Sequence, residues 1–333
     1  MTVDIDGFLT KSGPCFDVRS PQEFLHAKIP GAISLPLFSD QERAEVGTAY
    51  KRQGKDVAIR LGVKIVGPKL DSMLASVDRQ IRSKEPIRIY CWRGGMRSGF
   101  VSYFLSFTGY PTLQLKGGYK AFRRFVLSQL AKPLNLYVVG GYTGVGKTEL
   151  LYALEKQGEK VLDLEKLACH RGSVYGEIIG SKQPTNEQFE NEIALALAQN
   201  DPQRPLWIED ESRLIGHCQI PSAVYEAKKR APLFVIEAPK EVRIERILQL
   251  YSGFPKSYWQ SATLKIQKRL GGLKTRQVLL CIEENRLIDG IVLLLDYYDR
   301  AYEHAISLHQ GPVVRFSENE RSIEDWAKTL TKG

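Results

Sequence analysis

One octapeptide, GYTGVGKT at residues 141–148, restricts the possible folds of this 333-residue chain more than any other feature. An apolar stretch at residues 134–140 precedes it, and a helical pattern follows it. In this strand, loop and helix context the glycine spacing and the Lys-Thr pair form the P-loop motif, whose backbone amides surround a phosphate chain. We therefore predict an α/β domain with a diphosphate-binding loop that consists of Gly141, Thr143, Gly144, Val145, Gly146, Lys147 and Thr148. The Thr148 hydroxyl is where Mg²⁺ would be held, if the site uses one.

A second anion-binding loop follows the apolar strand pattern of residues 87–90. Cys91 comes directly after that strand, a glycine pair lets the loop curl, and a helical pattern begins at Arg97. Unpaired backbone amides and nearby arginines favour a thiolate and can hold an anion beside it. We therefore predict a catalytic Cys91 within an anion cradle that consists of Trp92, Arg93, Gly94, Gly95, Met96, Arg97 and Ser98. The alternative is a buried structural cysteine.

The length of the chain and one break in its helical pattern indicate two domains. A single hydrophobic core rarely extends over 333 residues. Lys132 and Pro133 interrupt a helical pattern just before the P-loop strand, and short strands and helices alternate on both sides. We expect a parallel-sheet α/β domain over residues 1–131 and a P-loop NTPase-like α/β core over 132–240. A helical, basic C-terminal region over 241–333 is expected to pack on that core.

Acidic residues follow two further strand patterns in the P-loop domain. Asp163 ends the strand after the P-loop helix, and Glu209 ends the next one. Because the carboxyl ends of parallel strands meet at one edge of a sheet, we expect both to face the P-loop and to hold water on a metal ion or orient a nucleophile. For Asp210 and Glu211, capping of a helix is an alternative. A glycine-bracketed loop between these strands is predicted to face the substrate through His170, Arg171 and Ser173.

The basic residues are concentrated in two segments. Residues 1–130 contain 20 Lys and Arg against 11 Asp and Glu, and 20 − 11 = +9 is the whole net charge of the chain. Residues 246–282 contain no acidic residue. Positive charge interleaved with aromatic rings favours RNA, and we predict RNA contacts at Lys51, Arg52, Lys55, Lys265, Lys268, Arg269, Lys274 and Arg276. The alternatives are a solvated insertion at residues 47–62 and core positions for Tyr251, Phe254, Tyr258 and Trp259.

Composition argues against a membrane protein, and against a disulfide framework or a zinc site. The chain has no run of about 18 apolar residues, and its N-terminus lacks the basic and apolar segments of a secretion signal. Its five cysteines are scattered without a C-x-x-C pair. We therefore expect a cytoplasmic protein that does not bind a membrane.

Three segments resemble the rhodanese sulfurtransferase domain: FDVRSPQEF at residues 16–24, PGAISLP at 30–36, and the Cys91 loop. In that family the matching cysteine carries a persulfide. Short rhodanese loops commonly place four residues between the cysteine and an Arg-Ser pair, whereas five residues separate Cys91 from Arg97 here. The wider cradle is expected to suit a larger anion, such as one that carries a phosphate. Cysteine-dependent phosphatases share this spacing, which leaves that activity open.

With GGYTGVGKTEL at 140–150, LACHRGS at 167–173 and WIEDESRLIG at 207–216, the chain resembles the family of bacterial tRNA 2-selenouridine synthases over roughly residues 5–310. The resemblance implies a transferase that replaces sulfur by selenium in the wobble 2-thiouridine of a tRNA anticodon stem-loop. Selenophosphate is the implied selenium donor, and geranyl diphosphate, held by the P-loop, is the implied source of an S-geranylated intermediate.

The same resemblance implies that both donors are substrates, so that no cofactor is tightly bound, with Mg²⁺ optional. An enzyme that produces selenophosphate is then a candidate partner. Two other functions stay open at this point. One is a thiosulfate-type sulfurtransferase, and the other is a P-loop kinase or NTPase with a regulatory rhodanese domain.

Overall fold

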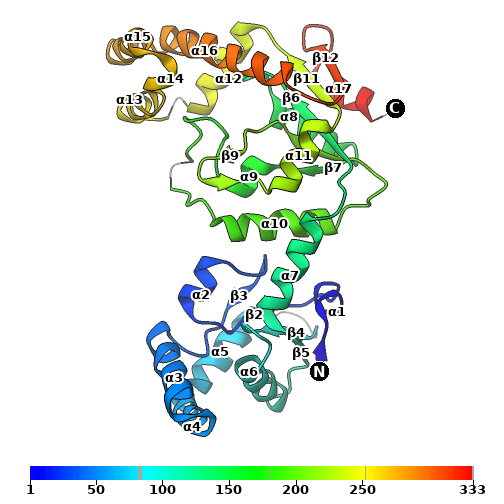
Figure 1. Cartoon of the computed structure of the whole chain (residues 1–333), viewed down its shortest axis with the longest axis vertical. Coiled ribbons are helices and arrows are strands. Elements are labelled where there is room, and N and C mark those ends of the chain that lie inside the picture. Colours follow the sequence, from blue (N-terminus) through cyan, green and yellow to red (C-terminus); the bar gives the residue numbers. More distant parts are fainter. Residues whose placement is uncertain (82–84, 179, 252, 332–333) are drawn as a thin grey trace. The chain divides into compact units, whose positions relative to one another are not determined.

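The computed structural model describes residues 1–81, 85–178, 180–251 and 253–331, and the chain divides into two compact units (Figure 1). The first unit contains residues 1–129 together with residues 190–195, and the second contains residues 130–189 and 196–333. Each unit is built on a five-stranded sheet in which all paired strands run parallel. The predicted α/β class with two parallel sheets is confirmed.

The sheet of the first unit has the strand order β1-β5-β4-β2-β3. Its strands are β1 (Thr2–Val3), β2 (Cys15–Asp17), β3 (Ile33–Ser34), β4 (Ile87–Tyr90) and β5 (Thr112–Leu115). Its helices are α1 (Ile5–Leu9), α2 (Pro21–His26), α3 (Asp40–Gln53), α4 (Lys55–Val66), α5 (Leu70–Gln80), α6 (Met96–Phe107) and α7 (Gly118–Leu130), with a 3₁₀ turn at Gly67–Lys69.

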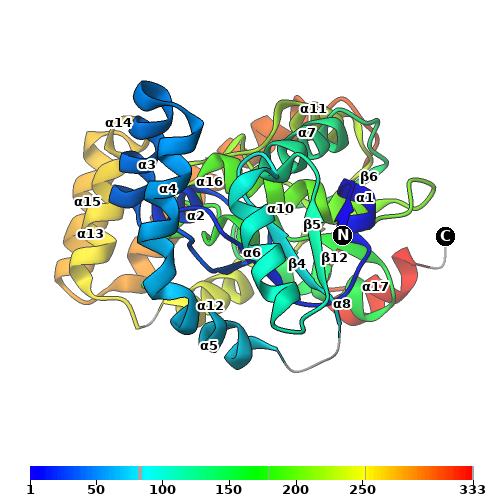
Figure 2. The same ribbon diagram turned by 90° about the horizontal axis from the view of Figure 1, so that it is seen from below.

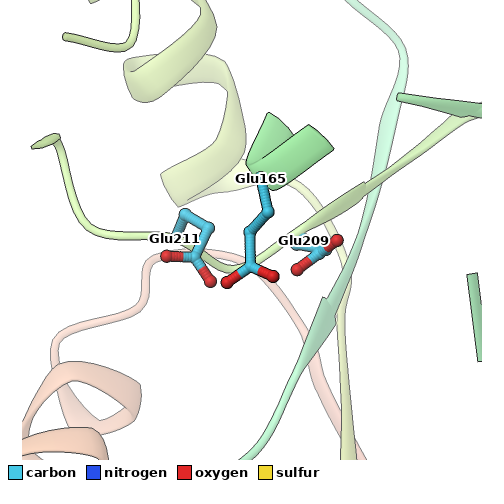
Figure 3. Close-up of side chains that lie close together, drawn as sticks. All are labelled: Glu165, Glu209 and Glu211. Carbon is cyan, nitrogen blue, oxygen red and sulfur yellow. The ribbon is translucent and has the colours of Figure 1, made fainter. Parts of the chain in front are cut away.

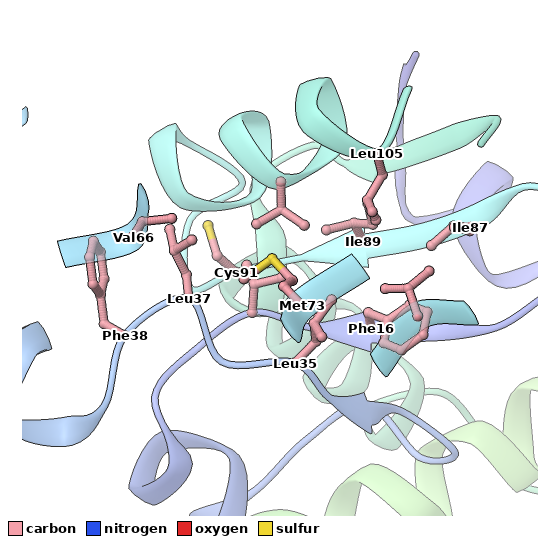
Figure 4. Close-up of a cluster of buried hydrophobic side chains, with 13 residues drawn as sticks. Phe16, Leu35, Leu37, Phe38, Val66, Met73, Ile87, Ile89, Cys91 and Leu105 are labelled. Carbon is pink, nitrogen blue, oxygen red and sulfur yellow. The ribbon is translucent and has the colours of Figure 1, made fainter. Parts of the chain in front are cut away.

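Side chains of β4 alternate between two apolar layers, as expected for a strand that is covered on both faces. Ile87 and Ile89 belong to a buried cluster that includes Met73 of α5 and Leu105 of α6 (Figure 4). Tyr90 lies on the opposite face, where its ring contacts the rings of residues in α1 and α7. The Cys91 loop therefore follows a strand whose two faces are both packed against other side chains.

Residues 47–62, expected as an insertion between strands, form part of a helical hairpin. Helices α3 and α4 pack side by side (Figure 2), with Gly54 between them at φ +94°. Ser39 and Glu42 form a capping box at the start of α3, which satisfies amides that a helix cannot pair internally. Lys51, Arg52 and Lys55 are exposed on this hairpin.

The sheet of the second unit has the strand order β12-β11-β6-β8-β7. Its strands are β6 (Leu136–Gly140), β7 (Lys160–Leu162), β8 (Leu206–Glu209), β11 (Leu233–Glu237) and β12 (Val313–Ser317), and a two-stranded antiparallel hairpin is formed by β9 (Leu214–Ile215) and β10 (Cys218–Gln219). The helices are α8 (Lys147–Lys156), α9 (Leu164–Ala168), α10 (Asn186–Ala198), α11 (Ser222–Arg230), α12 (Lys240–Tyr251), α13 (Lys256–Lys265), α14 (Gln267–Leu270), α15 (Gly272–Glu283), α16 (Leu287–Ser307) and α17 (Ile323–Leu330).

The C-terminal region is not wholly helical, in contrast to the sequence-based expectation for residues 241–333. Strand β12 pairs with β11 and forms an edge of the sheet, and α17 packs on the P-loop helix α8. The sequence pattern does not predict this strand, because its first three residues are exposed and only Phe316 is buried. An edge strand of this kind lacks the continuous apolar run of a central strand.

The aromatic residues of the C-terminal region belong mainly to a hydrophobic core. Tyr251 and Trp259 are buried, and Phe254 and Tyr258 pack against the same cluster. Their interpretation as stacking platforms for RNA bases is therefore wrong, and the alternative of core positions holds. Among the described residues, no helix is long and apolar enough to cross a membrane.

A buried ion pair stabilises the end of β2. Arg19 is 1% exposed, and its guanidinium donates to Asp17 Oδ2 at 2.6 Å and to the Ala27 carbonyl at 2.6 Å. The same guanidinium lies 4.0 Å from the centroid of the Tyr119 ring. Removal of the carboxylate would leave a buried charge without its counterion.

We expect Asp17→Ala to lower the free energy of unfolding of the first unit by about 3–5 kcal/mol. Urea unfolding followed by circular dichroism measures this as a lower transition midpoint. The control is Glu45→Ala, which removes an exposed carboxylate of α3 and should leave the midpoint nearly unchanged. An equal effect of the two substitutions would show that the buried pair does not stabilise the unit.

Candidate functional site

Cys91 lies between the end of β4 and the start of α6, as predicted. It is 3% exposed, and its side chain lies beside Leu37 and Met73 at the edge of the core (Figure 4). The Cys91 Sγ is 3.2 Å from the Ser98 Oγ. Within the described part of the chain no side chain caps the start of α6, so the amides of its first turn remain available for an anion next to the sulfur.

The Cys91 loop is held by close contacts with the start of α7. A Cβ at Gly118 would lie 2.1 Å from the Cys91 carbonyl oxygen, and a Cβ at Gly94 would lie 2.4 Å from the Leu115 carbonyl oxygen. Both glycines have positive φ, +56° and +64° respectively, which other residues rarely adopt. The Tyr119 amide donates to the Cys91 carbonyl at 2.8 Å. Backbone packing thus fixes where the sulfur lies.

Gln114 of β5 is a member of this site that was not predicted from sequence. Its Nε2 donates to Ser98 Oγ at 2.9 Å and to the Gly94 carbonyl at 2.9 Å. Because Ser98 Oγ accepts from Gln114, its own proton is free to be donated to Cys91 Sγ or to the Gly95 carbonyl. Only the parallel pairing of β4 with β5, which sets Ile89 beside Gln114, reveals this role.

The two arginines of the cradle differ in their surroundings. Arg97 donates to Glu23 Oε2 at 2.8 Å, and Glu23 also accepts from the Ser20 amide at the start of α2. Partial burial is the largest single influence and opposes ionisation, but the hydrogen bond and charge of Arg97, the Ser20 amide and the charge of Arg43 together outweigh it, so the pKa of Glu23 is lowered. Arg97 is therefore paired with Glu23 rather than directed to an anion. Arg93, Trp92 and Met96 are exposed on the loop.

The P-loop has the predicted strand, loop and helix arrangement, from the end of β6 at Gly140 to the start of α8 at Lys147. A Cβ at Gly141 would lie 2.4 Å from the Ile236 carbonyl oxygen, and a Cβ at Gly146 would lie 2.8 Å from Ile323 Cδ1. Arg243 Nε donates to the Thr143 carbonyl at 2.9 Å. These contacts hold the loop in one conformation.

A cavity of about 470 Å³ opens beside this loop. The predicted residues that line it are Thr143, Gly144, Val145, Gly146, Lys147, Thr148, Asp163, His170, Arg171, Ser173 and Glu209. Residues of the wall that were not predicted as site residues are Glu165, Glu211, Arg246 and Tyr302, among others. The proposed phosphate loop, acidic strand ends and substrate loop therefore belong to one cavity of the second unit. Gly141 does not line the cavity, although its carbonyl accepts from Lys147 Nζ at 3.2 Å.

Cationic groups of the cavity are suited to an anion. Burial alone would lower the pKa of Lys147, but the charges of Tyr302 and of nearby glutamates such as Glu211 raise it, so the ammonium form is retained. Arg171 NH1 is buried and has no hydrogen-bond partner among the described residues. A phosphate group in the cavity could satisfy it.

Acidic groups occupy the same cavity. One carboxylate oxygen each of Glu165, Glu209 and Glu211 lies within 4.8 Å of the others (Figure 3). Burial and repulsion from Glu211 raise the pKa of Glu165 to about 8, and burial with repulsion from Glu165 raises the pKa of Glu209 well above its ordinary value. Asp163 is occupied differently, because it caps α9 and accepts from the Tyr152 hydroxyl at 2.6 Å.

These carboxylates fit a hard divalent cation such as Mg²⁺, which prefers oxygen ligands. The observation that supports the fit is that both oxygens of Glu209 are buried without a hydrogen-bond partner among the described residues. Thr148, which was expected to lie near such an ion, lines the same cavity. Bound there, a divalent cation would supply electrostatic stabilisation of a phosphate group.

A small apolar annex adjoins the cavity. The annex shares Thr143, Ser173, Ile247 and Tyr251 with the cavity wall. Its remaining lining residues are Tyr175, Trp259, Ile291, Leu294, Leu295 and Tyr298, which come from the segment before α10 and from helices α13 and α16. The annex is about 40 Å³ in volume, so it offers apolar surroundings to a small part of a ligand whose phosphate lies in the cavity.

The predicted basic residues of the second unit lie outside the cavity. Lys265, Lys268, Arg269 and Arg276 are exposed on α13, α14 and α15, and Lys274 is half-buried. Lys265 Nζ lies 3.8 Å from Glu177 Oε2. Exposure is compatible with RNA contacts, and that role stays a prediction.

Two family models match successive parts of the chain. Residues 7–125 match the family model of the rhodanese-like domain, and residues 134–332 match the model described as the tRNA 2-selenouridine synthase AAA domain. The tRNA 2-selenouridine synthase of Shewanella frigidimarina (strain NCIMB 400) is 34% identical over 96% of this chain and 95% of its own length. The corresponding proteins of Aeromonas salmonicida (strain A449) and Hydrogenovibrio crunogenus (strain DSM 25203 / XCL-2) are each 34% identical, covering 98% and 97% of this chain and 96% and 97% of their own lengths.

Ser98→Ala should slow the alkylation of Cys91 by iodoacetamide near neutral pH by about tenfold, because a hydrogen bond to a charged group contributes about 1.5 kcal/mol. Peptide-resolved mass spectrometry measures the rate at Cys91 alone. The control is Ser128→Ala, which removes an exposed hydroxyl of α7. If Cys91 of Ser98→Ala were alkylated as fast as Cys91 of the protein without a substitution, the hydroxyl would not stabilise the thiolate.

Proposed function

Since the chain belongs to the tRNA 2-selenouridine synthase family, we propose that it replaces the sulfur of a wobble 2-thiouridine in tRNA by selenium. Selenophosphate is the proposed selenium donor. An S-geranylated nucleoside, formed from geranyl diphosphate, is the proposed intermediate. The observation that carries this proposal is that each unit has a glycine-rich loop between a parallel strand and a helix, one beginning at the Cys91 thiol and one beside an apolar annex.

Alkylation of the base is assigned to the second unit. The 2-thio sulfur attacks C1 of geranyl diphosphate, the C1–O bond breaks, and diphosphate leaves with the bonding electron pair. The P-loop amides and Lys147 would stabilise the negative charge that develops on the leaving group. Arg171, whose NH1 has no partner among the described residues, would provide a second cation.

The apolar annex is the observation that supports a prenyl diphosphate as the P-loop ligand. Its mainly aromatic and aliphatic lining, with Trp259 and Leu294 at its walls, suits a hydrocarbon, since burial of apolar area is favourable by about 25 cal/mol per Å². At about 40 Å³ the annex would receive only part of a geranyl chain. The proposal includes no hydrolysis of ATP.

Exchange of sulfur for selenium is assigned to the first unit. An S-alkylated 2-thio group is a better leaving group than the parent thiocarbonyl. The selenium of selenophosphate attacks C2, the C2–S bond breaks and the geranyl thiolate departs; water then cleaves the Se–P bond, which releases phosphate and leaves the 2-selenouridine. Cys91 is the proposed catalytic residue of this step, and the free amides at the start of α6 would hold the phosphate part of the donor. The exposed basic residues Lys51, Arg52 and Lys55 would attract the tRNA backbone.

Cys91→Ala should reduce formation of 2-selenouridine by at least about 10³-fold, in the range seen when a catalytic nucleophile is removed. Formation of the S-geranylated nucleoside should continue, because it is assigned to the other unit. Liquid chromatography with mass spectrometry of nucleosides from tRNA incubated with the protein and both donors measures the two products separately. Normal selenation by this variant would remove Cys91 from the mechanism.

Lys147→Ala should have the opposite profile, with geranylation reduced by about 10²–10³-fold through loss of charge stabilisation. Selenation of tRNA that has been geranylated beforehand should be retained. The matched control is Lys156→Ala, an exposed residue of the same helix α8, which should behave as the unmodified chain. Unimpaired geranylation by Lys147→Ala would show that the P-loop does not bind the prenyl donor.

A further inference from the structure

We propose that the edge of the first unit around the Cys91 loop is an RNA-binding surface, on which an unpaired base stacks against Trp92. Four exposed cations of the same edge would contact the phosphates on either side of that base. We call these five residues the loop rim, which consists of Trp92, Arg93, Lys116, Lys120 and Arg124. That the bound RNA is tRNA rests on the proposed function, whereas the binding of unpaired RNA follows from the rim itself.

The segment that forms this edge carries positive charge only. Residues 86–131 contain seven Lys and Arg and no Asp or Glu. Three of the seven are bound to carbonyl or carboxylate oxygens, and these are Arg88, Arg97 and Arg123. The other four are exposed and form no ion pair with any described residue, and these are Arg93, Lys116, Lys120 and Arg124. Asp17 and Glu23, two acids of the same sheet edge, are paired with arginines. Exposed cations without counterions favour a polyanion as the ligand.

Strand pairing and backbone contacts bring the rim together. Strands β4 and β5 are parallel neighbours, so Trp92, which follows β4 by two positions, and Lys116, which follows β5, lie at the same edge of the sheet. The Lys120 amide donates to the Trp92 carbonyl at 3.0 Å. A Cβ at Gly117 would lie 3.5 Å from a guanidinium nitrogen of Arg124, so this side chain reaches back to the start of α7.

The Trp92 ring is held by buried groups and is also open to solvent. Its centroid lies 5.6 Å from that of Tyr119, which is fully buried, and the Arg19 guanidinium lies 5.8 Å from the ring. The Trp92 side chain is nevertheless 38% exposed. A single exposed ring needs no explanation. A ring that is held in place and accompanied by unpaired cations is the arrangement that binds unpaired bases.

The burial of Cys91 explains why the base must be unpaired. The residue is 3% exposed, so the thiol cannot approach C2 of a base that remains inside a helical stack. Enzymes that react with a base therefore act on a single strand or take the base out of the stack. Trp92, the next residue in the chain, would hold such a base at the loop that contains the thiol.

The test of the ring is binding of a stem-loop RNA with unmodified uridine in its loop to the whole chain, measured by fluorescence anisotropy of labelled RNA. Trp92→Ala should weaken this binding by about tenfold, in the range for loss of one stacked base. Binding of fully paired RNA should stay nearly unchanged. Tyr103→Ala is the matched control, because Tyr103 is a 73% exposed ring of α6 outside the rim, and it should bind as the protein without a substitution does.

The cations are tested separately, through the dependence of binding on salt. Each phosphate contact contributes about one to the slope of log affinity against log salt concentration. The double substitution Lys116→Ala and Lys120→Ala should weaken binding of stem-loop and paired RNA alike and reduce that slope by about two. The control is Lys11→Ala, which removes an exposed cation before β2, at the other edge of the sheet, and should leave the slope unchanged.

Intrinsic fluorescence reports on the Trp92 ring itself. Trp207 and Trp259 are buried, and Trp326 packs on Phe316 in the second unit. The stem-loop RNA should quench tryptophan emission. Trp92→Phe should lose this quenching and keep most of the affinity, because it keeps an aromatic ring at the rim.

Four outcomes would overturn the proposal. They are equal affinity of Trp92→Ala and the protein without a substitution for the stem-loop, an equal loss in Tyr103→Ala, an unchanged salt slope in the double lysine variant, and tighter binding of anionic lipid vesicles than of RNA by the rim. Normal RNA binding in a protein that does not selenate geranylated tRNA would count against the proposed function alone. If Trp92→Ala does not fold, the quenching measured with Trp92→Phe takes its place.

Discussion

The parallel register between β6 and β8 decides what the phosphate loop faces. Val139 lies opposite Glu209, and the Asp210 amide donates to the Val139 carbonyl at 2.8 Å. Because β6 leads directly into the P-loop, this pairing sets a carboxylate beside an anion-binding loop in every folded molecule. Buried charged groups cost free energy in the empty cavity unless each is paired or contacts a bound ligand. The cavity is therefore arranged for binding, at some expense to the stability of the empty protein.

In the first unit, backbone contacts and not side-chain charges determine the shape of the Cys91 loop. Cys91 follows β4 as the P-loop follows β6, and in both units the loop lies at the carboxyl end of parallel strands. The Cys91 loop is shaped by its approach to Gly118, while its arginine at position 97 is paired with Glu23. Fixed amides, and not mobile cations, are then the main source of positive potential next to the sulfur.

Much of this arrangement was predictable because it depends on local sequence. The P-loop, the Cys91 loop and the acidic end of β8 each follow an apolar strand, so strand patterns alone place each of them at the carboxyl edge of its own sheet. Glu165 was missed because it lies inside a helix, and Gln114 because its role depends on strand pairing. A carboxylate two positions after Asp163 was the only available signal for Glu165.

The predictions for the aromatic residues of the C-terminal region and for β12 failed for one physical reason. Whether a residue is buried depends on segments that are distant in the sequence. Tyr251 and Trp259 lie in a basic stretch that is typical of an RNA-binding surface, yet helices α12, α13 and α16 enclose them in one core. Nothing within the stretch itself distinguishes a ring that faces solvent from a ring that faces another helix. Strand β12 was overlooked for the converse reason, because its exposed residues hid its pairing with β11.

The position of β12 and α17 has a consequence for the phosphate loop. Ile323 contacts the P-loop at Gly146, and residues 313–317 provide the second neighbour of β11. The packing of the loop therefore depends on two segments that lie far from it in the sequence. A substitution in β12 or α17 would loosen the phosphate loop without changing any residue of the loop itself.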